Sequence, residues 1–265
     1  MENTIDYNLL LSPSEIYHEN SKLHAGSISL YTWIGYVNSH QGIRQIICRP
    51  HGLYAGYPKV ELPKTFEKST LSFEEIIASR RSFRQFSREP MGINTLSTLL
   101  YDANGVTSIQ HSDDGSSWSL RTTPSGGGLF PIELYCIVVN VEGLESGLYY
   151  FNAIEHMLYQ IEIGSDVVER LSEAMPALNG AIESCNVCFL MNSVLTRIKF
   201  KYGERAYRFA LMEVGHIGQN ILLGAESLGL GAFCVGGFLD DNLNAIIRVD
   251  GVTEAVQYSV LVGNK

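Results

Sequence analysis

The longest helical pattern of the chain is predicted over residues 205–228, because apolar residues recur there every three or four positions. One stripe consists of Ala210, Val214, Ile217, Ile221, Ala225 and Leu228. A second stripe consists of Leu211, Gly215, Gly218 and Leu222, whose glycines permit close approach of a neighbouring element. A helix that is apolar on two faces is predicted to be central rather than peripheral.

Shorter patterns predict the remaining elements of residues 66–265. Ser72 and Glu75 have the spacing of a capping box, and we expect a short helix from Phe73 and a second helix after Asn94 that ends at Gly105. The second helix is predicted to bury Leu96, Leu99, Leu100 and Ala103. Strands are predicted over 132–141, 147–151, 157–163, 185–195, 231–235 and 254–262, a helix over 166–175, and a polar loop over 107–119. The pattern is typical of an α+β domain with a mixed, mostly antiparallel sheet flanked by helices.

Residues 1–65 differ from the rest of the chain. They show few periodic patterns and are rich in Tyr, His, Gly and Pro. We therefore expect an N-terminal extension over 1–65, with short strands such as 43–48 and irregular connections, before a main domain over 66–265.

Composition and charge exclude several classes of protein. The 265 residues are 45% hydrophobic and 18% charged, as in a chain that buries a sizeable core. Nineteen Lys and Arg against 28 Asp and Glu give a net charge of −9, with no basic run, which argues against nucleic-acid binding. The N-terminus does not have the pattern of a secretory signal, and no uncharged apolar run is long enough to span a membrane. We expect a cytoplasmic protein.

The five cysteines do not predict a disulfide framework or a metal site. Cys185 and Cys188 form the only CxxC, and on the predicted strand their odd offset would send the two thiols to opposite faces. No second CxxC completes a zinc site. We interpret these cysteines as core residues.

Three segments carry groups that suit an anionic or planar ligand. The segment 80–84 contains Arg80, Arg81, Ser82 and Arg84, and guanidinium groups bind phosphate through charge-assisted hydrogen bonds. The segment 124–128 contains three glycines that allow a ligand to approach backbone amides. The segment 235–238 contains Gly236 and Gly237 after a predicted strand. Taken singly, each segment also fits a plainer interpretation: cations at a helix C-terminus, a flexible loop and a turn.

Taken together, the segments resemble a known family. The residues RRSFRQF at 80–86 are similar to the RRSxRxF signature of FMN-dependent enzymes of the nitroreductase fold. The residues PSGGGLFPIE at 124–133 resemble the PSGGALYPxE signature of the SagB-type, or McbC-like, azoline dehydrogenases. Segments 17–22, 61–64 and 200–220 also resemble that branch, so the similarity covers nearly the whole chain.

The resemblance implies a domain-entwined homodimer that binds FMN at the subunit interface. Arg80, Arg81, Ser82 and Arg84 would hold the ribityl phosphate and the pyrimidine edge, and Gly236 and Gly237 would lie near the reactive edge of the flavin. Pro124, Ser125, Gly126 and Gly127 would come from the other subunit. Many nitroreductases have Asn at the position of Gly128 and a longer basic tail, and these departures favour the azoline branch over the nicotinamide reductases.

The family's Lys-Tyr pair corresponds to Lys201 and Tyr202, which we assign to proton removal while the flavin accepts hydride and is reoxidised by O2. A lysine acts as a base only when burial or a cationic neighbour favours its neutral form. Adjacent residues face one ring only if the backbone is irregular, and Gly203 permits this. Without the resemblance, the segment would be interpreted as a solvated basic stretch.

The resemblance implies oxidation of thiazoline or oxazoline rings in a ribosomal precursor peptide, beside a cyclodehydratase partner. An NAD(P)H-dependent nitro- or quinone reductase on the same fold is the second hypothesis. A non-catalytic, flavin-bound scaffold of a synthetase complex is the third.

Overall fold

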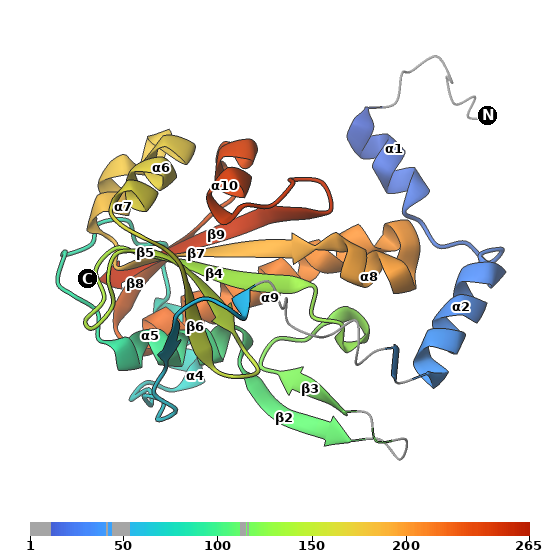
Figure 1. Cartoon of the computed structure of the whole chain (residues 1–265), viewed down its shortest axis with the longest axis horizontal. Helices are drawn as coiled ribbons and strands as arrows, with labels where there is room; N and C mark the ends of the chain where they lie inside the picture. The colour runs from blue at the N-terminus through green and yellow to red at the C-terminus, as the bar shows by residue number, and fades with distance from the viewer. Residues whose placement is uncertain (1–11, 41, 44–53, 112–114, 116) are drawn as a thin grey trace.

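A seven-stranded sheet forms the centre of the computed structural model, which describes residues 12–40, 42–43, 54–111, 115 and 117–265 (Figure 1). Its order is β1-β6-β5-β4-β7-β9-β8, and every pairing between these strands is antiparallel. Isolated parallel bridges join Ser82 to Ala232 and Met91 to Val141. The strands are β1 (Lys59–Glu61), β4 (Ile132–Val138), β5 (Gly147–Asn152), β6 (Met157–Ile163), β7 (Val187–Val194), β8 (Leu230–Val235) and β9 (Glu254–Asn264).

Helices cover both faces of this sheet, as β4 shows most clearly. Its side chains alternate, so Leu134 and Cys136 join one apolar cluster and Tyr135 and Ile137 join the other. The helices α5 (Ile93–Asn104) and α9 (Ala206–Ser227) pack on the first face, and α6 (Asp166–Ala174), α7 (Asn179–Ser184) and α10 (Asp240–Ile247) pack on the second (Figure 1). The predicted α+β class with a mostly antiparallel sheet and flanking helices is confirmed.

The two helices that flank the arginine segment form where the sequence predicts them. The helix α4 (Phe73–Ser79) begins with the Ser72–Glu75 capping box, and Arg80 ends it. The four residues predicted to be buried on α5 are fully buried, and Gly105 ends that helix. The capping box therefore determines where α4 begins, and α4 leads directly into the segment 80–84.

The prediction of a polar loop over 107–119 is wrong. The strands β2 (Val106–His111) and β3 (Ser117–Arg121) pair as a separate antiparallel ribbon. Most of β2 is exposed, so neither face of this ribbon needs the apolar alternation by which strands are recognised in a sequence.

The described part of the N-terminal region contains two helices rather than the irregular structure that we predict from its sequence. The helix α1 (Pro13–Asn20) begins with a capping box of Ser12 and Glu15, and α2 (Ile28–Ser39) follows it. The strand predicted over 43–48 lies outside the described residues, apart from Ile43. Since β1 pairs with β6, the end of the predicted extension joins the central sheet, and the boundary at residue 65 stays a prediction.

The helix α9 is apolar on two sides but buried on only one in this single chain. Its first stripe is buried from Ala210 to Ala225. In the second stripe, Gly218 is buried against Tyr258, whereas Leu211 is 44% exposed. The predicted central position therefore holds for one face of the helix.

Cys185 and Cys188 are buried core residues, as predicted, but they do not lie on opposite faces of a strand. Cys185 ends α7, and both cysteines belong to the same apolar cluster. Burial raises the pKa of the Cys185 thiol to about 12, so this thiol is inert at neutral pH. Among the described residues, no helix is both long and apolar enough to cross a membrane.

Candidate active site

The glycine-rich segment 124–130 is a shaped loop rather than a flexible one. It contains the short 3-10 helix η2 (Gly126–Gly128), in which Gly127 and Gly128 have φ values of 67° and 63°. The Ser125 hydroxyl accepts a hydrogen bond from the backbone N–H of Phe130 at 2.8 Å. This bond ties the two ends of the loop together, and the left-handed φ values explain the glycines.

Lys201 and Tyr202 converge on this loop. A Cβ atom at Gly127 would lie 2.3 Å from the Tyr202 hydroxyl and 2.8 Å from Lys201 Nζ. Both residues end α8 (Leu195–Tyr202), and the chain then turns at Gly203, whose φ is 53°, into η4 (Gly203–Arg205). The predicted irregularity is present, so both side chains reach one point. Lys201 is 5% exposed, which removes most of the water from around its amine.

A buried ion pair supports the loop from beneath. Arg197 Nη2 lies 2.5 Å from Glu133 Oε1, and Arg197 also donates to the carbonyl oxygen of Phe130. The Tyr150 hydroxyl donates to Glu133 Oε2 at 2.8 Å. These contacts hold the Phe130 backbone at its positive φ of 45°. The sequence marks Glu133 only as part of the segment 124–133 that carries the resemblance, and no local signal marks Arg197, because only the fold brings it to the loop.

The arginines of the segment 80–84 do not converge on one point as Lys201 and Tyr202 do. Arg81 is exposed and donates to the carbonyl oxygens of Ala78 and Arg80. The guanidinium of Arg84 lies 5.1 Å from the ring centroid of Phe233, beside a hollow of about 540 Å³ that it helps to line. Ser82 is exposed and bridges to β8.

Arg80 lies on the other side of β8 from Arg84. It is close enough to Cys234 to oppose the burial that raises the pKa of that thiol. Cys234 and Phe233 are consecutive in β8, so they point to opposite faces of the sheet. The structure therefore does not gather Arg80 and Arg84 around one point.

Gly236 and Gly237 are exposed residues that follow β8 directly. A Cβ at Gly236 would meet only the Tyr258 ring, at 3.5 Å, and a Cβ at Gly237 would meet nothing within 4 Å. Nothing in the single chain therefore requires glycine at these two positions.

The predicted site residues form two groups along α9. The glycine-rich loop meets α9 at Phe209, which would be 3.3 Å from a Cβ at Gly126. Tyr258, next to Gly236, meets α9 at Gly218. These contacts lie two and a half turns apart, or about 13 Å. The prediction that the two groups meet across a subunit interface stays a prediction.

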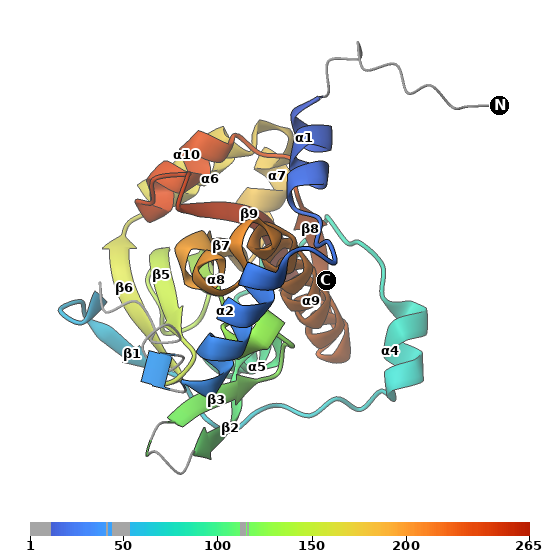
Figure 2. The same ribbon diagram turned by 90° about the vertical axis from the view of Figure 1, so that its right-hand side faces the viewer.

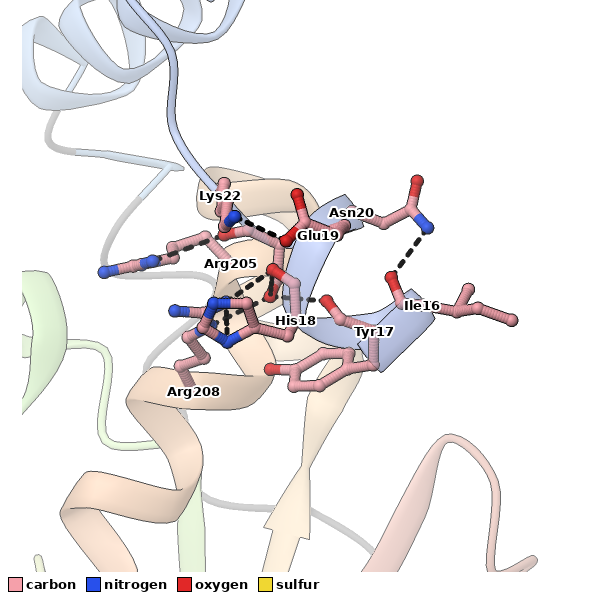
Figure 3. A network of polar contacts seen from close by, with 9 residues as sticks. Ile16, Tyr17, His18, Glu19, Asn20, Lys22, Arg205 and Arg208 are labelled. Atoms are coloured by element: carbon pink, nitrogen blue, oxygen red, sulfur yellow. Dashed lines mark hydrogen bonds and ion pairs between the residues drawn. The ribbon is translucent and has the colours of Figure 1, made fainter. Parts of the chain in front are cut away.

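The N-terminal helices brace the segment that carries Lys201 and Tyr202 (Figure 2). The Trp33 indole donates to the carbonyl oxygen of Phe200 at 2.7 Å. Beyond the pair, Arg208 donates to the Ser21 hydroxyl at 2.8 Å and to the carbonyl oxygen of His18 at 2.7 Å (Figure 3). Contacts on both sides of the pair therefore come from residues 12–39.

The residues fit a planar anionic group such as FMN. In the part of the chain that the structure describes, Arg80, Arg81 and Arg84 have no carboxylate within ion-pair distance. Unpaired guanidinium groups are available to phosphate. The loop also exposes Gly127, beside which Lys201 and Tyr202 would face a ligand.

With this geometry in place, comparison with known proteins defines the class. The family model described as "Nitroreductase family" matches residues 77–264, so the chain belongs to this family. Proteins of the family generally bind flavin and are oxidoreductases. Among its relatives, "Putative nitroreductase MJ1384" of Methanocaldococcus jannaschii is 31% identical over 195 residues, which are 72% of this chain and 90% of that protein.

Within the family the chain is McbC-like, as its sequence predicts. The microcin B17-processing protein McbC of Escherichia coli is 31% identical over 223 residues, 75% of this chain and 76% of McbC. The trifolitoxin-processing protein TfxB of Rhizobium leguminosarum bv. trifolii is 36% identical over 113 residues, 42% of this chain but only 30% of TfxB.

Solved structures share the fold. An E. coli microcin synthetase McbBCD complex with truncated pro-MccB17 bound contains a chain with a TM-score of 0.58 and 23% identity, over 82% of both chains. A nitroreductase-fold structure from Anabaena variabilis has a TM-score of 0.64 and 25% identity, over 94% of this chain and 45% of that one.

Proposed function

We propose that the chain is an FMN-dependent dehydrogenase that oxidises thiazoline or oxazoline rings of a ribosomal peptide to thiazoles or oxazoles. The observation that carries the proposal is the convergence of Lys201 and Tyr202 on Gly127. Two relatives named for the processing of microcin B17 and of trifolitoxin, McbC and TfxB, support this substrate class.

The reaction removes one proton and one hydride from adjacent ring carbons, which leaves the aromatic azole. FMN, when bound, supplies the hydride acceptor and passes the electrons to O2. The chain's own residues must take the proton. Lys201 Nζ lies 5.2 Å from the centroid of the Tyr202 ring, and from these neighbouring positions both groups would act on a substrate carbon from one side. Lys201 is 5% exposed, and burial is one of the conditions under which a lysine acts as a base.

The proposal includes partners. A homodimer would complete the site, because the two groups of predicted site residues lie about 13 Å apart along α9. A cyclodehydratase would supply the azoline rings in the precursor peptide. The McbBCD structure, a microcin synthetase complex with truncated pro-MccB17 bound, supports a function within such an assembly. Analytical ultracentrifugation of the flavin-loaded protein tests the dimer.

Mass spectrometry tests the reaction. A cyclised peptide that contains azolines, incubated with flavin-loaded protein in air, is expected to lose two hydrogens per ring. Lys201→Ala and Tyr202→Phe are expected to keep FMN and lose the product. Lys199→Ala is the matched control, because Lys199 lies two residues earlier and is 43% exposed. Full product formation by Lys201→Ala and Tyr202→Phe together would remove the catalytic assignment and support the scaffold hypothesis.

The second candidate is an NAD(P)H-dependent nitro- or quinone reductase, which the relative MJ1384 favours. The same preparation distinguishes the two functions. Rapid bleaching of the yellow protein by NADH, with nitroarene turnover and no loss of hydrogen from the peptide, would establish the reductase. Wild-type protein that never takes up FMN would exclude both enzymes.

A further inference from the structure

Glu213 carries a buried carboxyl group that forms no hydrogen bond within the part of the chain that the structure describes. It lies on α9, is 1% exposed, and neither Oε1 nor Oε2 has a partner among the described residues. A buried polar group without a partner is costly, so it requires an explanation.

The position of Glu213 relates it to the glycine-rich loop. Phe209 lies against Gly126, and Glu213 is four residues further along α9, on the same face. The Ser125 hydroxyl and the backbone N–H of Ile132 are close enough to lower the pKa of Glu213, although neither is aligned as a hydrogen bond. Glu213 therefore lies beneath the loop, beside Ser125.

Burial and the neighbouring charges shift the pKa of Glu213 in opposite directions. Arg121 and Arg197 favour the ionised form, but Arg197 is already paired with Glu133. Burial has the largest effect and raises the pKa of Glu213 to about 7. The carboxyl group is therefore present in both forms near neutral pH.

The hydrogen bonds of Ser125 depend on which form is present. A hydroxyl group has one hydrogen to donate and two acceptor positions, and the N–H of Phe130 occupies one acceptor position. An ionised Glu213 can only accept, so it attracts the Ser125 hydrogen inward. A protonated Glu213 can donate to the second acceptor position, which leaves the Ser125 hydrogen free to point out of the loop.

We propose that Glu213 is a positioning residue that controls the direction of the Ser125 hydroxyl, so that its neutral form presents Ser125 to FMN as a hydrogen-bond donor and its ionised form withdraws that donor. The inference rests on the proposed function, in which Ser125 contacts FMN. It assigns a role in cofactor binding to a residue that does not itself touch the cofactor.

The test compares FMN dissociation constants of full-length wild type and Glu213→Gln between pH 6 and pH 8.5. The glutamine amide donates at every pH. The phosphate of FMN also titrates near pH 6, but it does so equally with both proteins, so the ratio of the two constants isolates Glu213. We expect the wild-type constant to equal that of Glu213→Gln at pH 6 and to be about three- to tenfold larger at pH 8.5, the effect of one hydrogen bond.

Ser125→Ala provides a second measurement should Glu213→Gln fail to fold. Its dissociation constant should exceed the wild-type value about three- to tenfold at pH 6 and match it at pH 8.5. A ratio that is constant across this pH range, for either variant, would overturn the inference and leave the proposed function intact. Wild-type protein that binds no FMN at any pH would overturn both.

Discussion

Gly127 and Tyr202 are 75 residues apart in the sequence, yet the loop backbone lies directly against the phenol. A Cβ at Gly127 would be 2.3 Å from the Tyr202 hydroxyl oxygen, a distance at which one of the two groups must move. The φ of 67° at Gly127 adds a second reason for glycine. The glycine is therefore required both by the turn and by the side chain that the turn faces.

Gly127→Ala is expected to displace Tyr202 and Lys201 and to lower the rate of azole formation about a hundredfold, because small displacements of catalytic groups have effects of this size. The left-handed conformation should also cost about 1–2 kcal/mol of stability. Peptide mass spectrometry and thermal unfolding measure the two effects.

Gly180→Ala is the matched control for this variant. A Cβ at Gly180, on α7, would meet nothing within 4 Å, so the rate should match wild type and the stability should not fall. A Gly127→Ala protein with the wild-type rate would show that the contact with Tyr202 has no role in the reaction.

Glu133→Gln is expected to lower the free energy of unfolding by about 3–5 kcal/mol, because it removes the carboxylate charge that pairs with the buried guanidinium of Arg197. Urea denaturation measures this change. Glu204→Gln breaks the exposed pair with Lys199 and should cost at most about 1 kcal/mol. Equal effects of the two variants would contradict a structural role for the buried pair.

Trp33→Phe tests whether the N-terminal helices position the Lys201–Tyr202 segment. The variant keeps a ring against Phe200, where the ring centroids are 5.2 Å apart, but removes the indole bond to the Phe200 carbonyl. We expect the rate of azole formation under single turnover to fall about fivefold, the effect of one hydrogen bond, with FMN affinity unchanged. Tyr31→Phe, at a 50% exposed position on the same helix, is the control. An unchanged rate for Trp33→Phe would show that this hydrogen bond contributes at most to the stability of the protein and not to the reaction.

Much of the central fold could be predicted because its elements carry strong periodic patterns. The face of α9 from Ala210 to Ala225 is fully or almost fully buried, and the strands predicted over 147–151 and 157–163 are present as β5 and β6. The N-terminal helices could not be predicted in this way. Within α2 only Val37 is buried, and α1 has no buried residue, so neither helix needs a continuous apolar stripe.

The candidate site was predicted by motifs, but its geometry was not. The sequence indicates Lys201, Tyr202 and the glycine-rich loop separately, and only the fold brings them together. The ion pair of Arg197 and Glu133 joins residues 64 positions apart, and no local signal marks such a contact.

Glu213 should make the stability of the protein depend on pH. Its pKa is about 7 in the folded protein and has an ordinary value of 4.5, so the folded state holds more protons than the unfolded state between these values. The free energy of unfolding should therefore be greatest, as far as Glu213 contributes, below pH 4.5 and fall by about 3 kcal/mol as the pH rises through 7.

Urea denaturation at pH 5 and pH 8 measures this dependence by comparing Glu213→Gln with wild type. The variant lacks the titrating group, so its stability relative to wild type should rise by about 2.5 kcal/mol between the two pH values. Glu204→Gln, at an exposed position, should show no such change. A difference between Glu213→Gln and wild type that is the same at both pH values would show that folding does not raise the pKa of Glu213, because only a group that titrates differently in the folded and unfolded states makes stability depend on pH.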